Sequence, residues 1–503
     1  MFDIIIKGGK ILDGAGNPYY LADIGIKDGA IVKIAKGLTG AKRVIDAKGL
    51  TVTPGFIDSH SHSDTQIITF PGQKEKVEQG ITTSIGGMCG GSIVPRPNSD
   101  EFYRTVGEFM EHTKELKLGA NIAFAVGHGN IRGAVLGNSD KDPTPEELEK
   151  MKAILREAME NGAIGMSLGL IYNPGCYSKT EELVELAKVV KEYDGLLTVH
   201  MRDEGDNLVR SVDEFLEIVR KSGVRGVISH HKAMKRDNFG KVAHTLRMID
   251  KANEDGFEVY CDAYPYTASH TSLSARFIPK EYRANGKMKE NLGNPDIRHT
   301  ITEYNKKMWG VWAEDLSWVQ VSTCNGYPEY QGLTIPEVAK IHGKSPFETI
   351  FDMIAASTNC QACFFMMCEE DVERVLSYER CMICTDSHVA GNDKVFHPRT
   401  LGTFPRVLGR YVREKKIVPL REMIRKMTSM PAQVYGLKRK GLLIEGYDAD
   451  IGIFDADKII DRSEFNDCTR GALGLSYVIV GGEVVCENAV YNGKRLGKVL
   501  IRN

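Results

Sequence analysis

The sequence has no apolar run of the roughly 18 residues that a membrane-spanning helix requires. Its first residues, MFDIIIKGGK, lack the basic segment and the cleavage site of a secretory signal peptide. The 65 lysines and arginines and the 67 aspartates and glutamates give a net charge of -2, without a basic stripe. We therefore expect a cytoplasmic protein that has neither a membrane nor a nucleic acid as its partner.

A disulfide framework is also not expected. The eleven cysteines are odd in number and scattered along 503 residues. In a long chain without a secretion signal, such cysteines are typically free thiols or metal ligands. The length predicts two to three domains, and nothing in the sequence predicts an oligomeric state.

The two ends of the chain share one pattern that the middle lacks. Short strand-like runs separated by glycine-rich turns such as GAGN and KDGA occupy residues 4–7, 10–12, 22–27, 30–35, 449–454, 475–480 and 484–486. This pattern predicts one small β-sandwich domain assembled from residues 1–54 and 435–503.

The middle of the chain alternates strand-like and helix-like stretches. Eight apolar runs cover residues 53–60, 82–86, 121–126, 164–168, 196–200, 226–230, 258–262 and 381–386, and amphipathic stretches such as 145–161 follow most of them. This alternation indicates parallel strands, and eight of them predict an α/β fold with a (β/α)8 TIM-like barrel over residues 55–434. Residues 275–375 are too many for one connection, so we expect an inserted subdomain near the barrel mouth.

Four histidines stand where three of these predicted strand segments end. His60 and His62 are two residues apart in an extended segment, so they face the same side. His200 and His230 end the fifth and sixth strands, at the edge of the barrel where catalysis takes place. Neutral imidazole is the commonest metal-binding side chain. The four positions predict a metal site, the alternative being surface or core histidines without a ligand.

An aspartate ends the eighth predicted strand. Asp386 follows the apolar run CMICT, and a carboxylate at the barrel mouth can accept a proton from an activated water and pass it to a leaving group. Asp386 is therefore the predicted general base. The alternative is a helix N-cap, a position that also favours aspartate.

A second cysteine pattern fits the spacing of a zinc ribbon. Cys360 and Cys363 are followed after seventeen residues by Cys381 and Cys384. The latter two lie in a predicted strand, where residues i and i+3 face opposite sides and cannot share an ion. This alternative is therefore disfavoured.

Several motifs resemble a known family. PGFIDSHSHSD, VH, ISHHK, TDS and EGYDADIGIFD are similar to the amidohydrolase superfamily. HSHSD, GITTSIGGMCGGS, SLGLIY, ISHHK, YPYTAS and HPRTLGTFPRVLG resemble its D-aminoacylase branch, which deacylates N-acyl-D-amino acids. The resemblance covers nearly the whole chain. It implies a zinc hydrolase whose partner is a small-molecule N-acyl amino acid, and the preference for the D enantiomer rests on the resemblance alone.

The resemblance also bears on the metal ligands. Many amidohydrolases bridge two metals with a carboxylated lysine of the fourth strand, which here reads AIGMSLGLIY and has no lysine. Cys89 matches the position of a cysteine in the branch, and a thiolate favours zinc. One tightly bound zinc would be held by Cys89, His200 and His230, and a second, weaker site would comprise His60 and His62. The alternative for Cys89 is an inert buried thiol.

Met88, in GGMCGG, departs from the branch, in which GNCG is common. We expect different hydrogen bonding beside Cys89 as a result.

A substrate carboxylate would need cationic or hydrogen-bonding partners. Lys232, two residues beyond His230, faces the same side of the strand. The resemblance adds Tyr172 and Tyr264, and Arg399 is a further candidate. For each of these the alternative is an ordinary surface or packing residue.

Two other functions compete with deacylation. A cyclic amide (hydantoin or imide) hydrolase of the same superfamily is disfavoured by the missing lysine. A non-catalytic metal-binding protein would be expected to lose polar strand ends, whereas all five predicted ligands and Asp386 are present.

Overall fold

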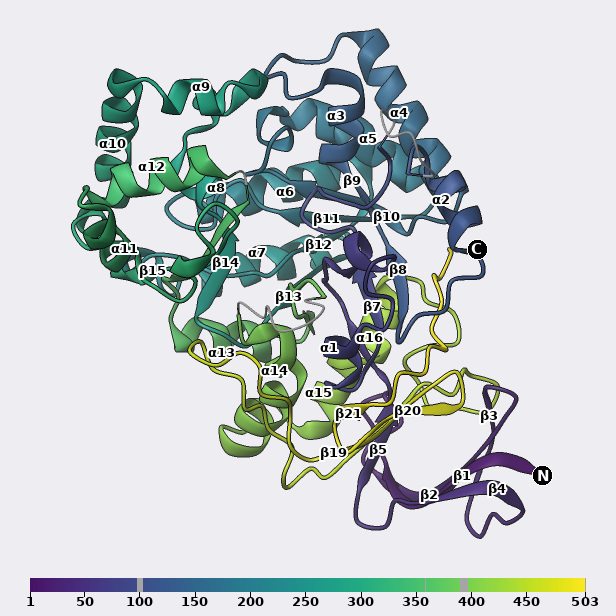
Figure 1. Ribbon diagram of the computed structural model, residues 1–503. Helices are drawn as coiled ribbons and strands as arrows, with labels where there is room; N and C mark the ends of the chain where they lie inside the picture. Colours follow the sequence, from purple (N-terminus) through teal and green to yellow (C-terminus); the bar gives the residue numbers. More distant parts are fainter. Residues whose placement is uncertain (97–102, 358, 390–396, 503) are drawn as a thin grey trace.

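The two ends of the chain build one sheet (Figure 1). The computed structural model describes residues 1–96, 103–357, 359–389 and 397–502. The strands of this sheet are β1 Phe2–Ile11, β2 Tyr20–Lys27, β3 Ala30–Ala35, β4 Ala41–Asp46, β5 Thr51–Pro54, β18 Ile451–Phe454, β19 Leu475–Val480, β20 Glu483–Glu487 and β21 Val490–Tyr491. Antiparallel pairing of β5 with β18 joins the N-terminal strands to the C-terminal ones.

The predicted barrel is confirmed. Its strands are β6 Phe56–Asp58, β7 Ile81–Gly86, β8 Asn121–Phe124 continued by β9 Val126–Gly127, β10 Gly165–Gly169, β11 Leu196–His200, β12 Arg225–Ile228, β13 Val259–Ala263 and β17 Cys381–Ile383. Parallel pairing runs in the order β6-β7-β8 and β9-β10-β11-β12-β13-β17. The backbone N–H of Ser59 donates to Ile383 O at 3.3 Å, and this bond brings the first strand beside the last.

The first strand expected for the barrel is divided between two sheets. Residues 53–60 were expected as a single run, but Thr53 and Pro54 belong to β5 of the terminal sheet, and β6 of the barrel starts at Phe56. A side chain at Gly55, between them, would place its Cβ 2.2 Å from Thr82 Oγ1. The chain can therefore pass from one sheet to the other only with glycine at this position.

Helices cover the outside of the barrel (Figure 1). They are α1 Lys74–Val77, α2 Val106–Thr113, α3 His128–Leu136, α4 Pro145–Glu160, α5 Thr180–Glu192, α6 Leu208–Ser222, α7 Val242–Glu254, α13 Glu369–Ser377, α14 Arg399–Arg406, α15 Leu420–Met427 and α16 Ser429–Val434. α4 starts with a capping box between Thr144 and Glu147, and α6 ends at Gly223 in the left-handed region. The buried face of α6, with Val212, Phe215 and others, packs into the barrel core.

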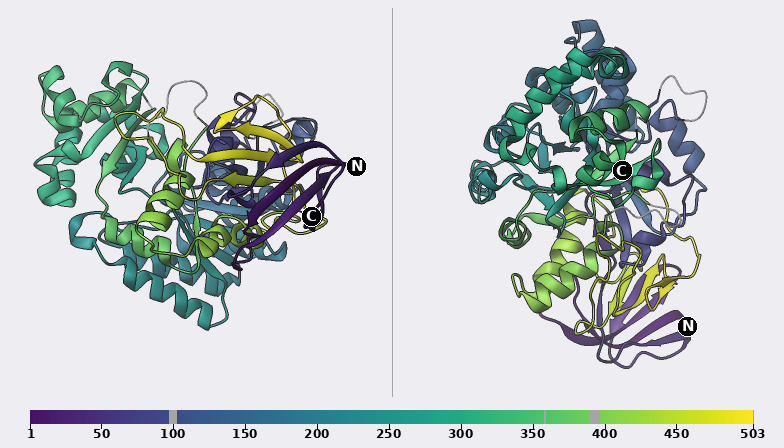
Figure 2. Two further views of the ribbon diagram at one scale, coloured as in Figure 1. Left: turned by 90° about the horizontal axis from the view of Figure 1, so that it is seen from below. Right: turned by 60° about the vertical axis from the view of Figure 1, so that its left-hand side comes forward.

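An inserted subdomain has its own core. Its antiparallel sheet has the order β14 Ala268–Ser272, β16 Cys360–Phe365, β15 Val319–Cys324, and its helices are α8 Leu273–Phe277, α9 Met288–Leu292, α10 Pro295–Trp309, α11 Ile335–His342 and α12 Pro346–Ala356. The rings of Phe277, Trp309 and Trp318 pack together. Figures 1 and 2 show that this subdomain and the terminal sheet lie at opposite ends of the molecule.

The cysteines differ in part from expectation. Cys324 and Cys360 form a disulfide between the neighbouring strands β15 and β16, although free thiols were expected. The register places these two residues directly opposite each other, and the sequence pattern could not show this pairing. The other nine cysteines form no disulfide within the described residues, and Cys360 is not available for a zinc ribbon. No helix within the described ranges is long and apolar enough to span a bilayer.

A buried ammonium group closes the barrel between β6 and β17. Lys76 Nζ is fully buried and donates to Asp58 Oδ2 at 2.9 Å, to Thr385 Oγ1 at 2.7 Å and to Ser387 Oγ at 2.9 Å. Asp58 in turn accepts from the backbone N–H of Thr385 at 2.8 Å. These contacts fix the residues on both sides of Asp386.

Replacing Lys76 should test the strength of this closure. Lys76→Met leaves the carboxylate of Asp58 buried without its cation, so we expect the free energy of unfolding to fall by about 3–5 kcal/mol. Urea unfolding of the purified variant measures the change. Lys114→Met, at an exposed lysine, is the matched control and should shift stability by less than about 0.5 kcal/mol. Equal stability of the two variants would contradict the interpretation.

Candidate metal centre at the barrel mouth

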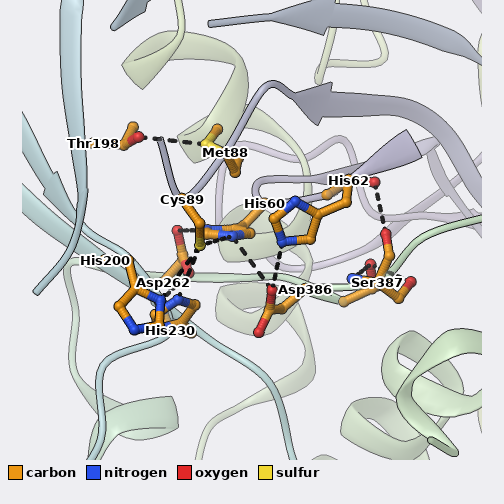
Figure 3. A network of polar contacts seen from close by, with 12 residues as sticks. His60, His62, Met88, Cys89, Thr198, His200, His230, Asp262, Asp386 and Ser387 are labelled. Atoms are coloured by element: carbon orange, nitrogen blue, oxygen red, sulfur yellow. Dashed lines mark hydrogen bonds and ion pairs between the residues drawn. The ribbon is translucent and has the colours of Figure 1, made fainter. Parts of the chain in front are cut away.

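Four predicted ligand residues converge at the carboxyl ends of the barrel strands (Figure 3). Cys89 Sγ lies 3.3 Å from His60 Nε2, 3.5 Å from His200 Nδ1 and 3.3 Å from His230 Nε2. All four side chains are buried. Sulfur and nitrogen ligands of one tetrahedral zinc lie roughly 3.5 Å apart, given the usual bond lengths. The four atoms therefore have the spacing of groups that can share an ion.

The potential ligand atoms form two overlapping groups. Oxygen, nitrogen and sulfur atoms of His60, Cys89, His230 and Asp386 lie within 4.8 Å of one another, as do those of His200, Glu204 and His230. His62 belongs to neither group within the described part of the chain. Its Nε2 lies 3.1 Å from Asp386 Oδ1, and its side chain is 19% exposed to solvent.

Three of these residues have an unusual backbone. Cys89, His230 and Asp386 have φ values of 54°, 37° and 48°, in the left-handed region that side chains with a Cβ disfavour. Such conformations cost about 1–3 kcal/mol each and cluster at functional sites. A Cβ on Gly169 would lie 1.9 Å from Cys89 O, so glycine lets the Cys89 loop approach β10.

The charges around Cys89 favour its thiolate. Burial raises the pKa of the thiol. The neighbouring His60, His230 and His200 together lower it by a larger amount, so the pKa falls well below its usual value. A thiolate is the form of cysteine that binds metals. The local electrostatics are therefore those of a ligand rather than of an inert thiol.

Asp386 is an ionised carboxylate. Burial raises its pKa, but the guanidinium of Arg399, together with His230, His62 and His60, lowers the pKa by more and holds it well below its ordinary value. Arg399 Nη1 donates to Asp386 Oδ2 at 2.7 Å, while Oδ1 faces His60 and His62. The carboxylate thus has one oxygen fixed by a cation and one directed at the predicted metal ligands.

Glu204 is a site residue that the sequence analysis missed. Its carboxylate lies behind the two histidines: Oε1 is 3.1 Å from His230 Nδ1, and Oε2 is 3.6 Å from His200 Nε2. Burial opposes ionisation, but Lys232, which pairs with Glu204, is the largest of the groups that bring the pKa well below its usual value. The available signal was an acid four residues after His200, in MRDEGD.

Asp262 was also missed. Its Oδ1 accepts a hydrogen bond from the backbone N–H of His230 at 2.6 Å, and its Oδ2 lies 3.6 Å from His60 Nδ1. Asp262 stands near the end of β13, so a search for polar residues at every strand end would have found it. It orients two potential ligands at once.

The predicted substrate-binding residues all line one cavity of about 480 Å³, together with Cys89, His200, His230 and Asp386. Lys232 and Arg399 lie on the ring of Tyr264, 5.8 Å and 4.9 Å from its centre. Tyr172 donates to or accepts from Thr271 Oγ1 at 2.8 Å, and its ring meets that of His200 edge to face. The structure therefore brings the four residues together around the candidate metal centre.

Comparisons with known proteins identify the family of the chain. The model of the amidohydrolase family matches residues 43–486. The chain belongs to the amidohydrolase family. D-aminoacylase from Alcaligenes xylosoxydans xylosoxydans is 33% identical over 100% of this chain and 98% of its own length, and N-acyl-D-glutamate deacylase from the same organism is 34% identical over 100% and 97%.

Solved structures show the same relationship. N-acyl-D-glutamate deacylase from Bordetella bronchiseptica, complexed with zinc and a phosphonate inhibitor that mimics the tetrahedral intermediate, superposes with a TM-score of 0.86 at 33% identity. Both chains are covered completely. L-hydantoinase from Arthrobacter aurescens, at 18% identity and a TM-score of 0.58, shares the fold.

Met88 has its own partner in this amidohydrolase. The side chain is fully buried, and the hydroxyl of Thr198 donates to its Sδ at 3.4 Å (Figure 3). A weak hydrogen bond to sulfur therefore occurs beside Cys89. The sequence analysis expected hydrogen bonding at Met88 to differ from that of the asparagine common in the branch.

Glu204 should control metal affinity through His200 and His230. In Glu204→Gln, the rear nitrogens of both rings lose their ionised partner, so we expect zinc affinity to fall about 10- to 100-fold. Competition with a chromophoric chelator measures this. Glu217→Gln, on the exposed side of α6, is the control and should bind zinc like the unmodified protein. An unchanged affinity in Glu204→Gln, with the fold intact by circular dichroism, would show that Glu204 has no such role.

Proposed function

We propose that this amidohydrolase uses zinc to remove the acyl group from N-acyl-D-amino acids. The observation that carries the proposal is the convergence of Cys89, His200 and His230 in a cavity that also holds Asp386, Lys232 and Arg399. The two full-length relatives that act on N-acyl-D-amino acids by name support it.

The donor atoms fit zinc. A thiolate with two imidazoles is a donor set that selects zinc over magnesium or calcium, and three protein ligands leave a position open, as in catalytic sites. Cys89, His200 and His230 would hold the tightly bound ion, and His60 with His62 would contribute to a weaker second site. When bound, zinc would lower the pKa of a water molecule and polarise the scissile carbonyl.

The absence of a lysine on β10 distinguishes this arrangement from a site bridged by a carboxylated lysine. This absence is why we favour linear amides over cyclic ones as substrates.

Asp386 would move the proton. Because its carboxylate is ionised, it can accept a proton from the attacking water as the new C–O bond forms. The low pKa of the group then favours transfer of this proton to the departing amine as the C–N bond breaks. Arg399 would keep the carboxylate in place during both transfers.

Lys232, Arg399 and Tyr264 would bind the substrate carboxylate. The two cations approach the same ring, so their charges are concentrated on one side of the cavity. A carboxylate there would gain charge-assisted hydrogen bonds, which are roughly twice as strong as neutral ones. Tyr172, beside His200, would contact the substrate from another wall of the cavity.

Replacement of the base should separate catalysis from metal binding. Asp386→Asn cannot accept the proton, so we expect kcat for an N-acetyl-D-amino acid to fall about 10²- to 10⁴-fold. Bound zinc, measured by metal analysis of the same sample, should stay at the unmodified level at the tight site. Asp213→Asn, at an exposed position, controls for charge. Undiminished turnover by Asp386→Asn would refute the assignment.

The carboxylate assignment predicts a difference between two substrates. Lys232→Met should raise KM for an N-acetyl-D-amino acid about 10-fold or more, because one charged hydrogen bond contributes about 1.5–3 kcal/mol. The matching carboxamide, which lacks the charge, should be affected much less. Steady-state kinetics on a panel of both enantiomers and of hydantoins test substrate class at the same time. Equal effects on acid and carboxamide would exclude the role.

A further inference from the structure

A second hollow opens from the candidate metal centre. This groove, of about 660 Å³, shares Cys89, Gly91, Arg96, Asn130 and Tyr172 with the main cavity, but neither Lys232 nor Arg399 lines it. Its walls include Gly91, Gly133 and other glycines, with Pro95 and Pro174. It continues to Asn138, which is exposed, so the groove runs from the metal ligands to solvent.

Barrel topology places this groove opposite the cations. Its walls come from the loops and helix that follow β7, β9 and β10, the second to fourth strands of the barrel. Lys232, Tyr264 and Arg399 follow β12, β13 and β17, the sixth to eighth strands. Because strand order around the barrel is sequential, the two sets occupy opposite halves of its mouth.

An N-acyl amino acid also has two chemically different ends, one on each side of the scissile bond. In an N-acyl amino acid, the carboxylate lies on the nitrogen side of the scissile C–N bond and the acyl chain on the carbonyl side. With the carboxylate on Lys232 and Arg399 and the amide beside Cys89, the acyl chain extends away from the cations. This step rests on the proposed function.

We propose that the glycine-lined groove is a subsite for the acyl chain, and that it accepts unbranched apolar acyl groups several carbons longer than acetyl. The glycines and prolines carry no charge, and the one cation that lines the groove within the described residues, Arg96, is exposed, with its guanidinium 5.6 Å from the ring centre of Tyr103. Each methylene that leaves water should improve binding roughly fourfold. The exposed outer end lets longer chains reach solvent without a clash.

The inner wall of the groove is held in place. Asn130 accepts from the backbone N–H of Ser92 at 2.9 Å and donates to Pro95 O at 3.1 Å. The backbone N–H of Gly129 donates to Gly90 O at 2.9 Å, and a Cβ on Gly129 would lie 2.7 Å from that oxygen. Gly129 is therefore required by backbone packing.

Two other glycines leave free space. A Cβ added at Gly133 would meet only Pro174 Cγ, at 3.9 Å, and one added at Gly91 only Met88 O, at 4.0 Å. Neither has a positive φ. Larger side chains can therefore be placed at these positions without backbone strain, and in α3 leucine favours the helix more than glycine does.

The test measures acyl-chain preference in the zinc-loaded enzyme. Acetyl, butanoyl and hexanoyl derivatives of one D-amino acid are compared by kcat/KM. The unmodified enzyme should prefer hexanoyl to acetyl, and Gly133→Leu should lower the hexanoyl-to-acetyl ratio at least tenfold. Gly91→Val should lower the same ratio and serves as the second variant. Gly471→Leu, where an added Cβ meets nothing within 4 Å and which lies outside both hollows, should leave the ratio unchanged.

The outcomes separate the two proposals. Equal losses for all chain lengths in both groove variants would overturn the acyl subsite. If the unmodified enzyme hydrolysed no N-acyl-D-amino acid, the proposed function would fail. Turnover of the acetyl derivative without a change in the ratio would overturn the subsite alone.

Discussion

The site depends on one buried sulfur atom placed among three imidazoles. Cys89 Sγ lies within 3.5 Å of ring nitrogens of His60, His200 and His230, and its neighbours favour the thiolate. A buried anion is costly unless cations or a metal compensate it. The left-handed backbone at Cys89, at His230 and at Asp386 is the strain that the surrounding loops must hold in order to present these three side chains together.

The remaining charges occur as matched pairs. Arg399 neutralises Asp386, and Lys232 neutralises Glu204. Each carboxylate also faces histidines of the candidate metal centre, so the two ion pairs orient the ligands as well as balance charge. A substrate carboxylate would contact Lys232 and Arg399 as well. Substrate binding would therefore affect the same two ion pairs that orient the histidines and Asp386.

Much of the fold could be predicted because short stretches of sequence specify its strands and helices. Each barrel strand is a short apolar run, each helix has a periodic apolar face, and consecutive strands of a βα series become neighbours. His60, His200, His230 and Asp386 could be predicted for the same reason, since polar residues at successive strand ends must meet at one rim. Cys89 was found through a motif, because it lies in a loop whose path no periodicity describes.

What the sequence alone determined is therefore the order of the elements and the residue types at their ends. The tertiary structure decided the contacts between distant segments: the pairing of β5 with β18, the disulfide of Cys324 with Cys360, and the place of Glu204 behind two histidines. The physical reason is that such contacts depend on sheet register and loop path. Register and loop path follow from the packing of the whole chain, and no short window of sequence contains that information.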